Sequence, residues 1–378
     1  MSSIRVLVVD DSALMRKLIP QALLRDSSIE VIGTAMDGLI GLRKIEELRP
    51  DVLTLDLDMP RMDGMEMLRQ ITRKQGVPVI VFSAHSEAGA AVTLKALGLG
   101  AFDFVAKPQD AASGSIERIA SELVLKIKAA AASGAPKIII SEPAAKQKNP
   151  KTSSASLKWP SLIVAIGVST GGPNALEYLF SQLPADFPGC LLVVQHMPEG
   201  FTAMFARRLD ESSALEVKEA KSGDLLLAGR VLICPGNRHL KVRRLEHGDV
   251  AVLDESSSVN GHRPSADVLF ESVAHQFSTR AVAVLMTGMG EDGVRGLGVV
   301  RSAGGITIAQ SLDTCVVESM PRAAIERGFV MRVVPLHLIA STLQSICAGG
   351  LASSASSQGT PLLRHGDSGN LAVRRRSS

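Results

Sequence analysis

The stretch Leu162–Gly171, LIVAIGVSTG, decides the fold of the second half of this chain. Its first five residues form an uninterrupted apolar run, which predicts a buried strand, and a helical pattern starts at Pro173. Between the two, Gly167-Val168-Ser169-Thr170-Gly171 places a serine on a tight strand-to-helix turn, the position of a hydrolase nucleophile. Because a glycine-rich turn can also bind phosphate without catalysis, the motif needs catalytic partners elsewhere.

Candidate partners follow two later apolar runs. His196 follows the run Cys190–Val194, and Asp292 follows the run Ala281–Met286. The carboxyl ends of parallel strands meet at one edge of a sheet, so these side chains are expected to lie near Ser169. A serine hydroxyl needs an imidazole to accept its proton, and the imidazole needs a carboxylate to hold its tautomer. We therefore predict a catalytic triad on a doubly wound, mostly parallel α/β domain. Its other strands are expected at Val231–Ile233 and Ile306–Ile308.

Glycines surround both Ser169 and Asp292, and they allow backbone amides to approach a reacting carbonyl. The amides of Thr170 and Met289 are the predicted donors to the oxyanion that forms on attack.

Other residues could fill the same roles, and these alternatives stay open. His239 and His262 are rival bases, although neither follows a strand end that can be placed opposite Ser169. We interpret His262 and Arg263 as residues of a substrate loop or as structural loop contacts. The alternative carboxylates are Asp254 and Asp267, the latter in the first turn of a helix, where an acid ordinarily stabilises the helix end.

The first 130 residues alternate strand-like runs with helical patterns, which predicts five βα units and a flavodoxin-like parallel sheet. The expected strands are Ile4–Val9, Val31–Ala35, Val52–Leu55, Val77–Phe82 and Phe102–Val105. Polar residues follow four of them at the edge where ligands bind: Asp10 and Asp11, Asp56, Ser83, and Lys107 with Pro108.

These polar residues predict a site that accepts a phosphoryl group. Three carboxylates at one edge would repel each other unless a divalent cation lay among them, and oxygen ligands suit Mg²⁺. Asp56 can then attack as a nucleophile, while Ser83 and Lys107 hold phosphoryl oxygens.

The stretch Asp56–Gly64, DLDMPRMDG, and the final Lys107 resemble the receiver domain of two-component response regulators. The resemblance covers nearly the whole first segment. It implies that a histidine kinase phosphorylates Asp56 and that Ser83 and Phe104 act as switch residues beside Lys107. It also implies that Asp11, Asp56 and the Asp58 backbone carbonyl hold Mg²⁺, and Asp10 at the same edge completes the predicted set of metal ligands.

The second half resembles the catalytic domain of the chemotaxis protein-glutamate methylesterase (CheB) family. Four motifs carry the resemblance in sequence order: Gly167–Pro173, Gln195–Pro198, Gly261–Asp267 and Thr287–Gly293. The family's triad falls on Ser169, His196 and Asp292. The resemblance implies hydrolysis of γ-glutamyl methyl esters on the cytoplasmic helices of chemoreceptors, and deamidation of receptor glutamines, with no cofactor for the ester hydrolysis. A receiver packed over the hydrolase would make this activity depend on phosphorylation.

Two other functions stay open on the residues alone. One is a phosphorylation-regulated binding module without catalysis, and the other is a hydrolase of a different ester.

Composition sets the remaining limits. The chain has 378 residues, of which 46% are hydrophobic and 21% charged, as expected for two or three globular domains. Only 3% of the residues are aromatic. The net charge is +3, but residues 133–160 carry +4 and residues 349–378 carry +3, so the remaining segments sum to −4 and nucleic-acid binding is not expected. With no signal peptide and no run of about 18 apolar residues, a cytoplasmic protein without membrane insertion is expected. The four scattered cysteines indicate reduced thiols: Cys190, Cys234, Cys315 and Cys347.

We predict a receiver domain at 1–130, a flexible linker at 131–158, a catalytic domain at 159–348 and a disordered tail at 349–378. The linker is rich in Pro, Lys and Ser, and hydrophobic periodicity stops after residue 350.

Overall fold

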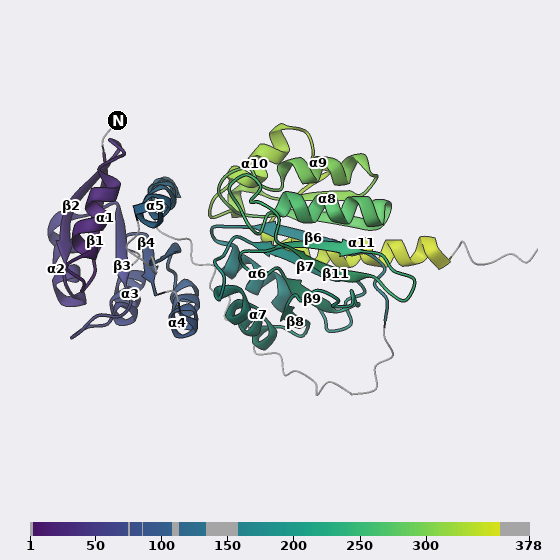
Figure 1. The fold of residues 1–378 in the computed structure, drawn as a ribbon, viewed down its shortest axis with the longest axis horizontal. Helices are drawn as coiled ribbons and strands as arrows, with labels where there is room; N and C mark the ends of the chain where they lie inside the picture. The colour runs from purple at the N-terminus through teal and green to yellow at the C-terminus, as the bar shows by residue number, and fades with distance from the viewer. Residues whose placement is uncertain (1–2, 75, 85, 108–112, 134–157, 356–378) are drawn as a thin grey trace, which may run out of the picture.

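The computed structural model describes residues 3–74, 76–84, 86–107, 113–133 and 158–355. They form two α/β domains (Figure 1). Most of the predicted linker, the tail from residue 356 and Pro108 lie outside the described residues. None of the helices in the described ranges combines the length and apolar character needed to cross a membrane.

The first domain contains a five-stranded parallel sheet in the order β2-β1-β3-β4-β5, which confirms the predicted fold class. Its elements in chain order are β1 (Ile4–Val9), α1 (Met15–Leu23), β2 (Ile29–Ala35), α2 (Gly38–Leu48), β3 (Val52–Asp56), α3 (Gly64–Arg73), β4 (Val79–Ser83), α4 (Glu87–Gly98), β5 (Asp103–Ala106) and α5 (Ser113–Ser133). Strand β4 starts later than predicted, after Pro78, which has no N–H to donate to a ladder. Helix α5 continues past residue 130, the predicted domain end.

Alternation along β1 shows why helices cover both faces of this sheet. Val6 and Val8 belong to a hydrophobic cluster that includes residues of α1 and α5, whereas Leu7 and Val9 belong to a cluster that includes residues of α2 and α3. A strand that is apolar on both sides must be covered on both sides, so the uninterrupted run IRVLVV produces a three-layer domain.

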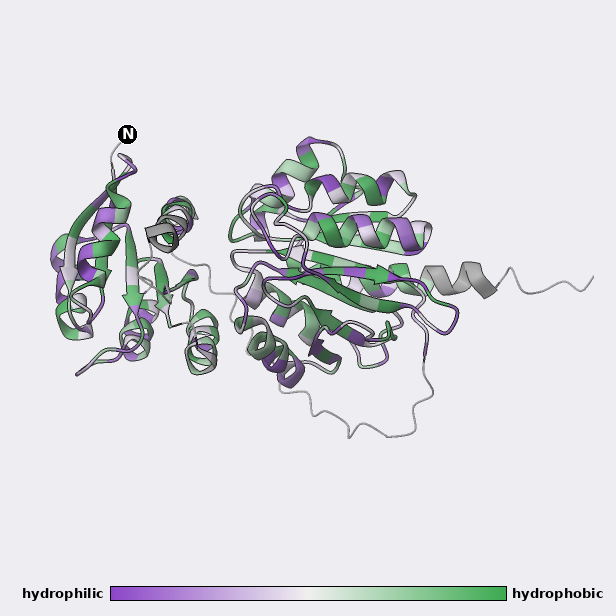
Figure 2. Ribbon diagram, viewed as in Figure 1, coloured by the Kyte–Doolittle hydropathy of each residue, from purple (hydrophilic) through white to green (hydrophobic). Residues whose placement is uncertain are grey.

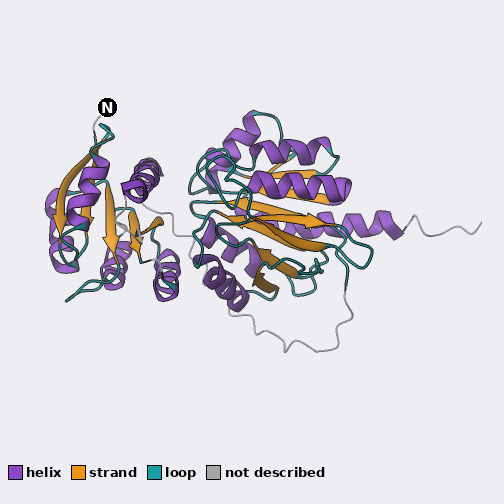
Figure 3. Ribbon diagram, viewed as in Figure 1, coloured by secondary structure: helices purple, strands orange, loops and turns teal. Residues whose placement is uncertain are grey.

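The second domain contains a seven-stranded parallel sheet in the order β14-β13-β12-β6-β7-β9-β8 and a separate antiparallel hairpin, β10-β11. Figure 3 shows strands and helices of both domains. The elements are β6 (Ile163–Val168), α6 (Gly172–Ser181), β7 (Cys190–Gln195), α7 (Phe201–Ser212), β8 (Glu216–Glu219), β9 (Arg230–Ile233), β10 (His239–Arg243), β11 (Val250–Asp254), α8 (Ala266–Phe277), η1 (Ser278–Arg280), β12 (Ala281–Leu285), α9 (Val294–Ser302), β13 (Ile306–Gln310), η2 (Leu312–Thr314), α10 (Ser319–Glu326), β14 (Arg332–Val334) and α11 (Leu336–Ala355).

Central strand β6 is buried along its whole length and contributes to two cores. Figure 2 shows that hydrophobic residues predominate in the central strands of this sheet. Ile163 and Ala165 pack with α8 and α9, while Val164 and Ile166 pack with α6, α7 and α11. The sheet is therefore doubly wound, as predicted. The neighbours of β6 in the sheet are β12 and β7, so the carboxyl ends of β12, β6 and β7 lie side by side.

The sequence did not predict β8, β14 or the hairpin. Strands β8 and β14 form the two edges of the sheet, and their short sequences EVKE and RVV contain no extended apolar run. Helix α11 runs to Ala355, so it extends past residue 348, the predicted end of the catalytic domain.

The two domains share one continuous hydrophobic cluster. It joins residues of α3 and α4 to residues of α6, α7 and α11. The first domain therefore packs on the second through the side of its sheet that carries α4.

Candidate active site and phosphoacceptor site

The turn after β6 holds Ser169 in place from two sides. The Ser169 amide donates to the Thr287 carbonyl at 3.0 Å, and the Gln195 side-chain amide donates to the Ser169 carbonyl at 3.0 Å. Gly171, at the start of α6, has a φ of 78°, a conformation that favours glycine. The predicted strand-to-helix turn is therefore present, and it is braced by the ends of β7 and β12.

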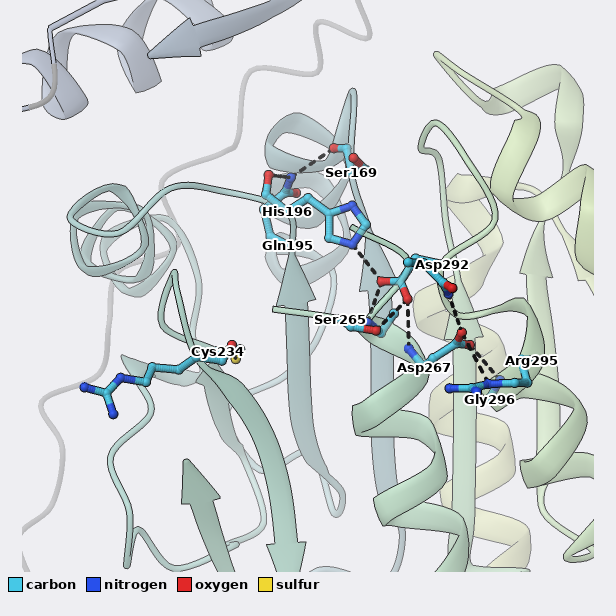
Figure 4. Close-up of polar contacts among 12 residues, drawn as sticks. Ser169, Gln195, His196, Cys234, Ser265, Asp267, Asp292, Arg295 and Gly296 are labelled. Carbon is cyan, nitrogen blue, oxygen red and sulfur yellow. Dashed lines mark hydrogen bonds and ion pairs between the residues drawn. The ribbon is translucent and has the colours of Figure 1, made fainter. Parts of the chain in front are cut away.

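His196 and Asp292 form the carboxylate–imidazole pair that the sequence predicts. The distance from His196 Nε2 to Asp292 Oδ2 is 2.8 Å (Figure 4). Asp292 also accepts hydrogen bonds from the Ser265 hydroxyl at 2.6 Å and the Ala266 amide at 2.6 Å. Burial by itself raises the pKa of Asp292, but the contacts from His196, Ser265 and Ala266 outweigh it and lower the pKa to about 2. The carboxyl is therefore ionised at any physiological pH.

Figure 4 shows the imidazole of His196 between Ser169 and Asp292. Because Nε2 is engaged by Asp292, the ring nitrogen left for Ser169 is Nδ1, which is buried and has no hydrogen-bond partner in the described part of the chain. No hydrogen bond of the Ser169 hydroxyl is recorded there either, so the Ser169–His196 contact stays a prediction. Catalytic hydrogen bonds often tighten only when substrate binds.

The turn after β12 lies directly against Ser169, the predicted nucleophile. A Cβ atom on Gly288 would lie 2.8 Å from the Ser169 Cβ, so only glycine fits there without displacement. The next residue is Met289, and its amide, like that of Thr170, has no recorded acceptor among the described residues. Both predicted oxyanion donors therefore flank Ser169, although their role remains a prediction.

The alternative base His239 and the alternative carboxylate Asp254 both lie on the hairpin β10-β11, and both have partners. His239 lies on the hairpin, where Nε2 contacts the Ser257 carbonyl at 3.1 Å, and Asp254 pairs with Lys241 on the same hairpin. Both are outside the triad. Asp267 is in the first turn of α8, as predicted, and its amide donates to Asp292 at 3.3 Å.

His262 lies closer to the triad than its sequence position indicated. Its ring stacks on the ring of His196, with centroids 3.9 Å apart and planes 4° apart. Burial, with a further contribution from His196, lowers the pKa of His262 to about 4. Arg263 turns away, to the Asn237 side-chain oxygen.

The receiver edge gathers the predicted acidic residues. Ligand oxygens of Asp10, Asp11 and Asp56 all lie within 4.8 Å of one another. Lys107 Nζ is 2.7 Å from Asp56 Oδ2 and 3.5 Å from Asp10 Oδ2. Burial raises the pKa of both Asp10 and Asp56, although the Lys107 ammonium opposes that rise.

This acidic cluster fits a divalent cation. Asp10 Oδ2 is buried without a hydrogen-bond partner in the described residues, and three carboxylates so close together repel each other. The oxygen ligands are those Mg²⁺ prefers. Asp58 is not among the three clustered acids, and its amide donates to Asp56 Oδ1 at 3.3 Å.

The two predicted switch residues contact different partners. Ser83 accepts a hydrogen bond from the Thr93 hydroxyl and donates to the Gly89 carbonyl at 3.2 Å, so it is bound to α4. Phe104 stacks on Phe201 of the catalytic domain, with ring centroids 4.9 Å apart.

Sequence reasoning missed the polar contacts between domains. The Thr170 hydroxyl donates to Asp103 Oδ2 at 2.7 Å, and the Asn174 amide donates to the Leu97 carbonyl at 3.0 Å. Arg208 donates to the Leu94 carbonyl and pairs with Glu177 at 2.7 Å. No local motif marks such residues, because the pairs are formed by segments about 70 to 115 residues apart.

Comparison with known proteins gives the same division of the chain. Residues 164–343 match the model of the CheB methylesterase family, and residues 6–115 match the response regulator receiver domain. A protein-glutamate methylesterase/protein-glutamine glutaminase of Koribacter versatilis is 61% identical over 90% of this chain and 95% of its own length. The chain belongs to the CheB methylesterase family. A relative with the same name from Symbiobacterium thermophilum is 46% identical over 90% of this chain and 96% of its own.

The match to CheB proteins includes both halves, so each candidate site lies in a domain of known type. The triad candidates fall within the methylesterase match, and the acidic cluster, Ser83 and Lys107 fall within the receiver match.

Proposed function

We propose that this protein hydrolyses γ-glutamyl methyl esters on the cytoplasmic helices of chemoreceptors, and deamidates receptor glutamines, under control of its receiver domain. The observation that supports it most strongly is the 2.8 Å contact between His196 and Asp292 beside the strand end that carries Ser169. The curated relatives carry the names of both activities.

In the proposed reaction, Ser169 Oγ attacks the side-chain carbonyl carbon of the methylated glutamate while His196 Nδ1 takes the hydroxyl proton. The amides of Thr170 and Met289 donate to the oxyanion. His196 then gives the proton to the departing methoxide, and methanol leaves an acyl-enzyme on Ser169. Water attacks this ester with His196 as the base, and Ser169 is released with a free glutamate.

Asp292 keeps its negative charge throughout. It holds the Nε2–H tautomer and stabilises the imidazolium that forms in each half of the reaction. A glutamine side chain would follow the same path, with ammonia as the leaving group, and no cofactor takes part in either reaction.

Regulation is proposed to start at Asp56, phosphorylated by a histidine kinase. Asp10, Asp11, Asp56 and the Asp58 carbonyl would hold Mg²⁺. The positive charge of the ion would offset the negative charge of the incoming phosphoryl oxygens. Ser83 and Lys107 would bind phosphoryl oxygens, and Ser83 would then leave Thr93 of α4. Helix α4 and β5 carry the contacts to the catalytic domain, so a change there loosens the receiver from Thr170 and Phe201.

The proposed domain organisation is a receiver at 1–130, extended to Ser133 by the end of α5, a linker from there to 158, a catalytic domain at 159–348, extended to Ala355 by the end of α11, and the tail beyond it. Because the proposed substrate helices are cytoplasmic, the proposed location is cytoplasmic as well.

The test is methanol release from methylated chemoreceptor by the full chain. Ser169→Ala is expected to reduce the rate by several orders of magnitude, since triad members act as a unit. Ser302→Ala is the matched control, because Ser302 is an exposed serine whose hydroxyl donates to the Gly298 carbonyl of its own helix. Full activity of Ser169→Ala would reject the mechanism.

A serine-directed fluorophosphonate separates catalysis from binding. An active hydrolase is labelled at Ser169 and not in Ser169→Ala, whereas a binding module is not labelled in either. Equal rates on methylated receptor and on a small methyl ester would contradict the proposed substrate.

A further inference from the structure

We propose that His262 is a positioning residue for the esterase reaction: its ring lies flat on the ring of His196 and holds the catalytic imidazole in the plane that serves both Asp292 and Ser169. This inference rests on the proposed function and adds a residue to it. The two rings are 3.9 Å apart between centroids and are parallel within 4°.

The need for such a residue follows from the contacts of His196. Asp292 binds one edge of its ring, at Nε2, and the opposite edge has no recorded hydrogen bond in the described residues. Torsions at the end of an aromatic side chain have broad minima, so one hydrogen bond leaves the ring free to swing. A flat neighbour in van der Waals contact restricts this movement, and Nδ1 then stays directed to where the Ser169 hydroxyl must deliver its proton.

The segment that carries His262 is itself held rigidly. The amide of Val259 donates to the His262 carbonyl at 3.0 Å, and the amide of His262 donates to the Val259 carbonyl at 2.9 Å. The two residues between them are left-handed, Asn260 with φ 52° and Gly261 with φ 79°. The Asn260 side-chain amide also donates to Asp267 Oδ2 at 2.9 Å.

The same segment also binds Asp292. Its last three residues, Ser265, Ala266 and Asp267, each donate a hydrogen bond to that carboxylate. Residues 259–267 therefore place both neighbours of His196, the carboxylate at its edge and the imidazole on its face. The motif GHRPSAD at residues 261–267 therefore has a structural role, which is to contact both His196 and Asp292.

The chemistry of the stacked ring suits the reaction. Because burial, with help from His196, lowers its pKa to about 4, His262 is neutral at physiological pH. When His196 becomes an imidazolium, a neutral π face beside it is favourable, whereas a second cation would be repelled. A ring on the face of His196 is also badly placed to replace it as the base, since proton transfer occurs at ring edges.

The experiment measures methanol release by the full chain, with Mg²⁺ and acetyl phosphate as a small phosphodonor. His262→Ala is expected to lower kcat about 10- to 100-fold, the scale for a misplaced catalytic group, with KM changed less than about twofold. His262→Phe keeps a flat ring without nitrogens and is expected to return kcat to within about threefold of wild type. His275→Ala, an exposed histidine on α8, is the matched control and keeps wild-type kinetics.

Two results would overturn the inference: wild-type kcat in His262→Ala, or a His262→Phe variant as slow as His262→Ala, which would show that a ring nitrogen is needed. Thermal unfolding of each variant shows whether it is folded, and His262→Phe, which keeps a flat ring, separates a loss of positioning from a folding defect. Failure of the proposed function is seen separately, as methanol release that survives Ser169→Ala.

Discussion

Asp103 of the receiver accepts a hydrogen bond from the hydroxyl of Thr170, with 2.7 Å between Oδ2 and Oγ1. Thr170 directly follows Ser169, and both Asp103 and Thr170 are buried. Asp103 in turn precedes Phe104, which stacks on Phe201, and it lies 3.4 Å from the ammonium of Lys126. The receiver therefore contacts the residue next to Ser169, the proposed nucleophile, through the strand that carries Phe104, the predicted switch residue.

Replacing Asp103 by Ala is expected to raise the esterase activity of the unphosphorylated protein. A hydrogen bond to a charged acceptor contributes about 1.5–3 kcal/mol, so its loss favours the open arrangement by about tenfold or more. The phosphorylated rate should not change. Methanol release with and without phosphodonor measures both. Asp26→Ala, which removes an ion pair to Lys128 within the receiver, is the control, and unchanged basal activity in Asp103→Ala would contradict the restraint.

A second contact between the domains can be tested with two adjacent arginines of α7, of which only one makes the contact. Arg208 of α7 donates to the Leu94 carbonyl of α4, while its neighbour Arg207 is exposed. Arg208→Ala is expected to raise basal activity several-fold, since a buried carbonyl loses its partner only in the closed arrangement. Arg207→Ala should behave as wild type. Equal effects of the two substitutions would indicate a general charge effect rather than this contact.

The low pKa of Asp292 predicts effects on rate and on stability. Asp292→Asn should lower kcat about 10⁴-fold, because the imidazole loses the partner that selects its tautomer. A pKa lowered from 3.8 to about 2 corresponds to about 2 kcal/mol of stability. That contribution is complete above pH 3.8 and is lost as the pH falls through 2. The free energies of unfolding of wild type and Asp292→Asn should therefore differ most near neutral pH. Chemical denaturation at pH 7 and pH 3 tests this, and a gap independent of pH would refute it.

Mg²⁺ should stabilise the receiver through its acidic cluster. A ligand present at 100 times its Kd adds about 2.7 kcal/mol to the free energy of unfolding. Asp11→Asn removes one clustered ligand, so the increase in Tm on adding Mg²⁺ should shrink. Asp51→Asn, an exposed aspartate outside the cluster, is the control. An equal Tm increase in both variants would argue against a metal at this cluster.

Without metal, burial of Asp10 in the same cluster predicts that the stability of the receiver falls as the pH rises, the opposite of the effect expected for Asp292. The folded-state pKa of Asp10 is raised, so the folded protein binds its proton more strongly than the unfolded chain does. That stabilisation is present at low pH and is lost as the pH rises through the folded pKa. In EDTA at neutral pH, Asp10→Asn should therefore raise the Tm of the receiver.

The sequence alone predicted the class of both domains and the candidate catalytic residues. Buried parallel strands need continuous apolar runs, and residues that follow such runs share one edge of a sheet, so Ser169, His196 and Asp292 could be placed together before any coordinates existed. The order β12-β6-β7 made these three ends direct neighbours. The edge strands β8 and β14 were missed because an edge strand can be short and polar.

Only the tertiary structure decided which residues contact the candidate triad within its own domain and which contacts the receiver makes beside it. His262 could not be told from an ordinary loop histidine, because its contact with His196 depends on two consecutive left-handed residues that turn the loop back. Likewise Asp103 and Arg208 carry no local signature, since their partners belong to another domain. Local sequence specifies strands, turns and the groups at strand ends, whereas contacts between distant segments arise only when whole domains pack together.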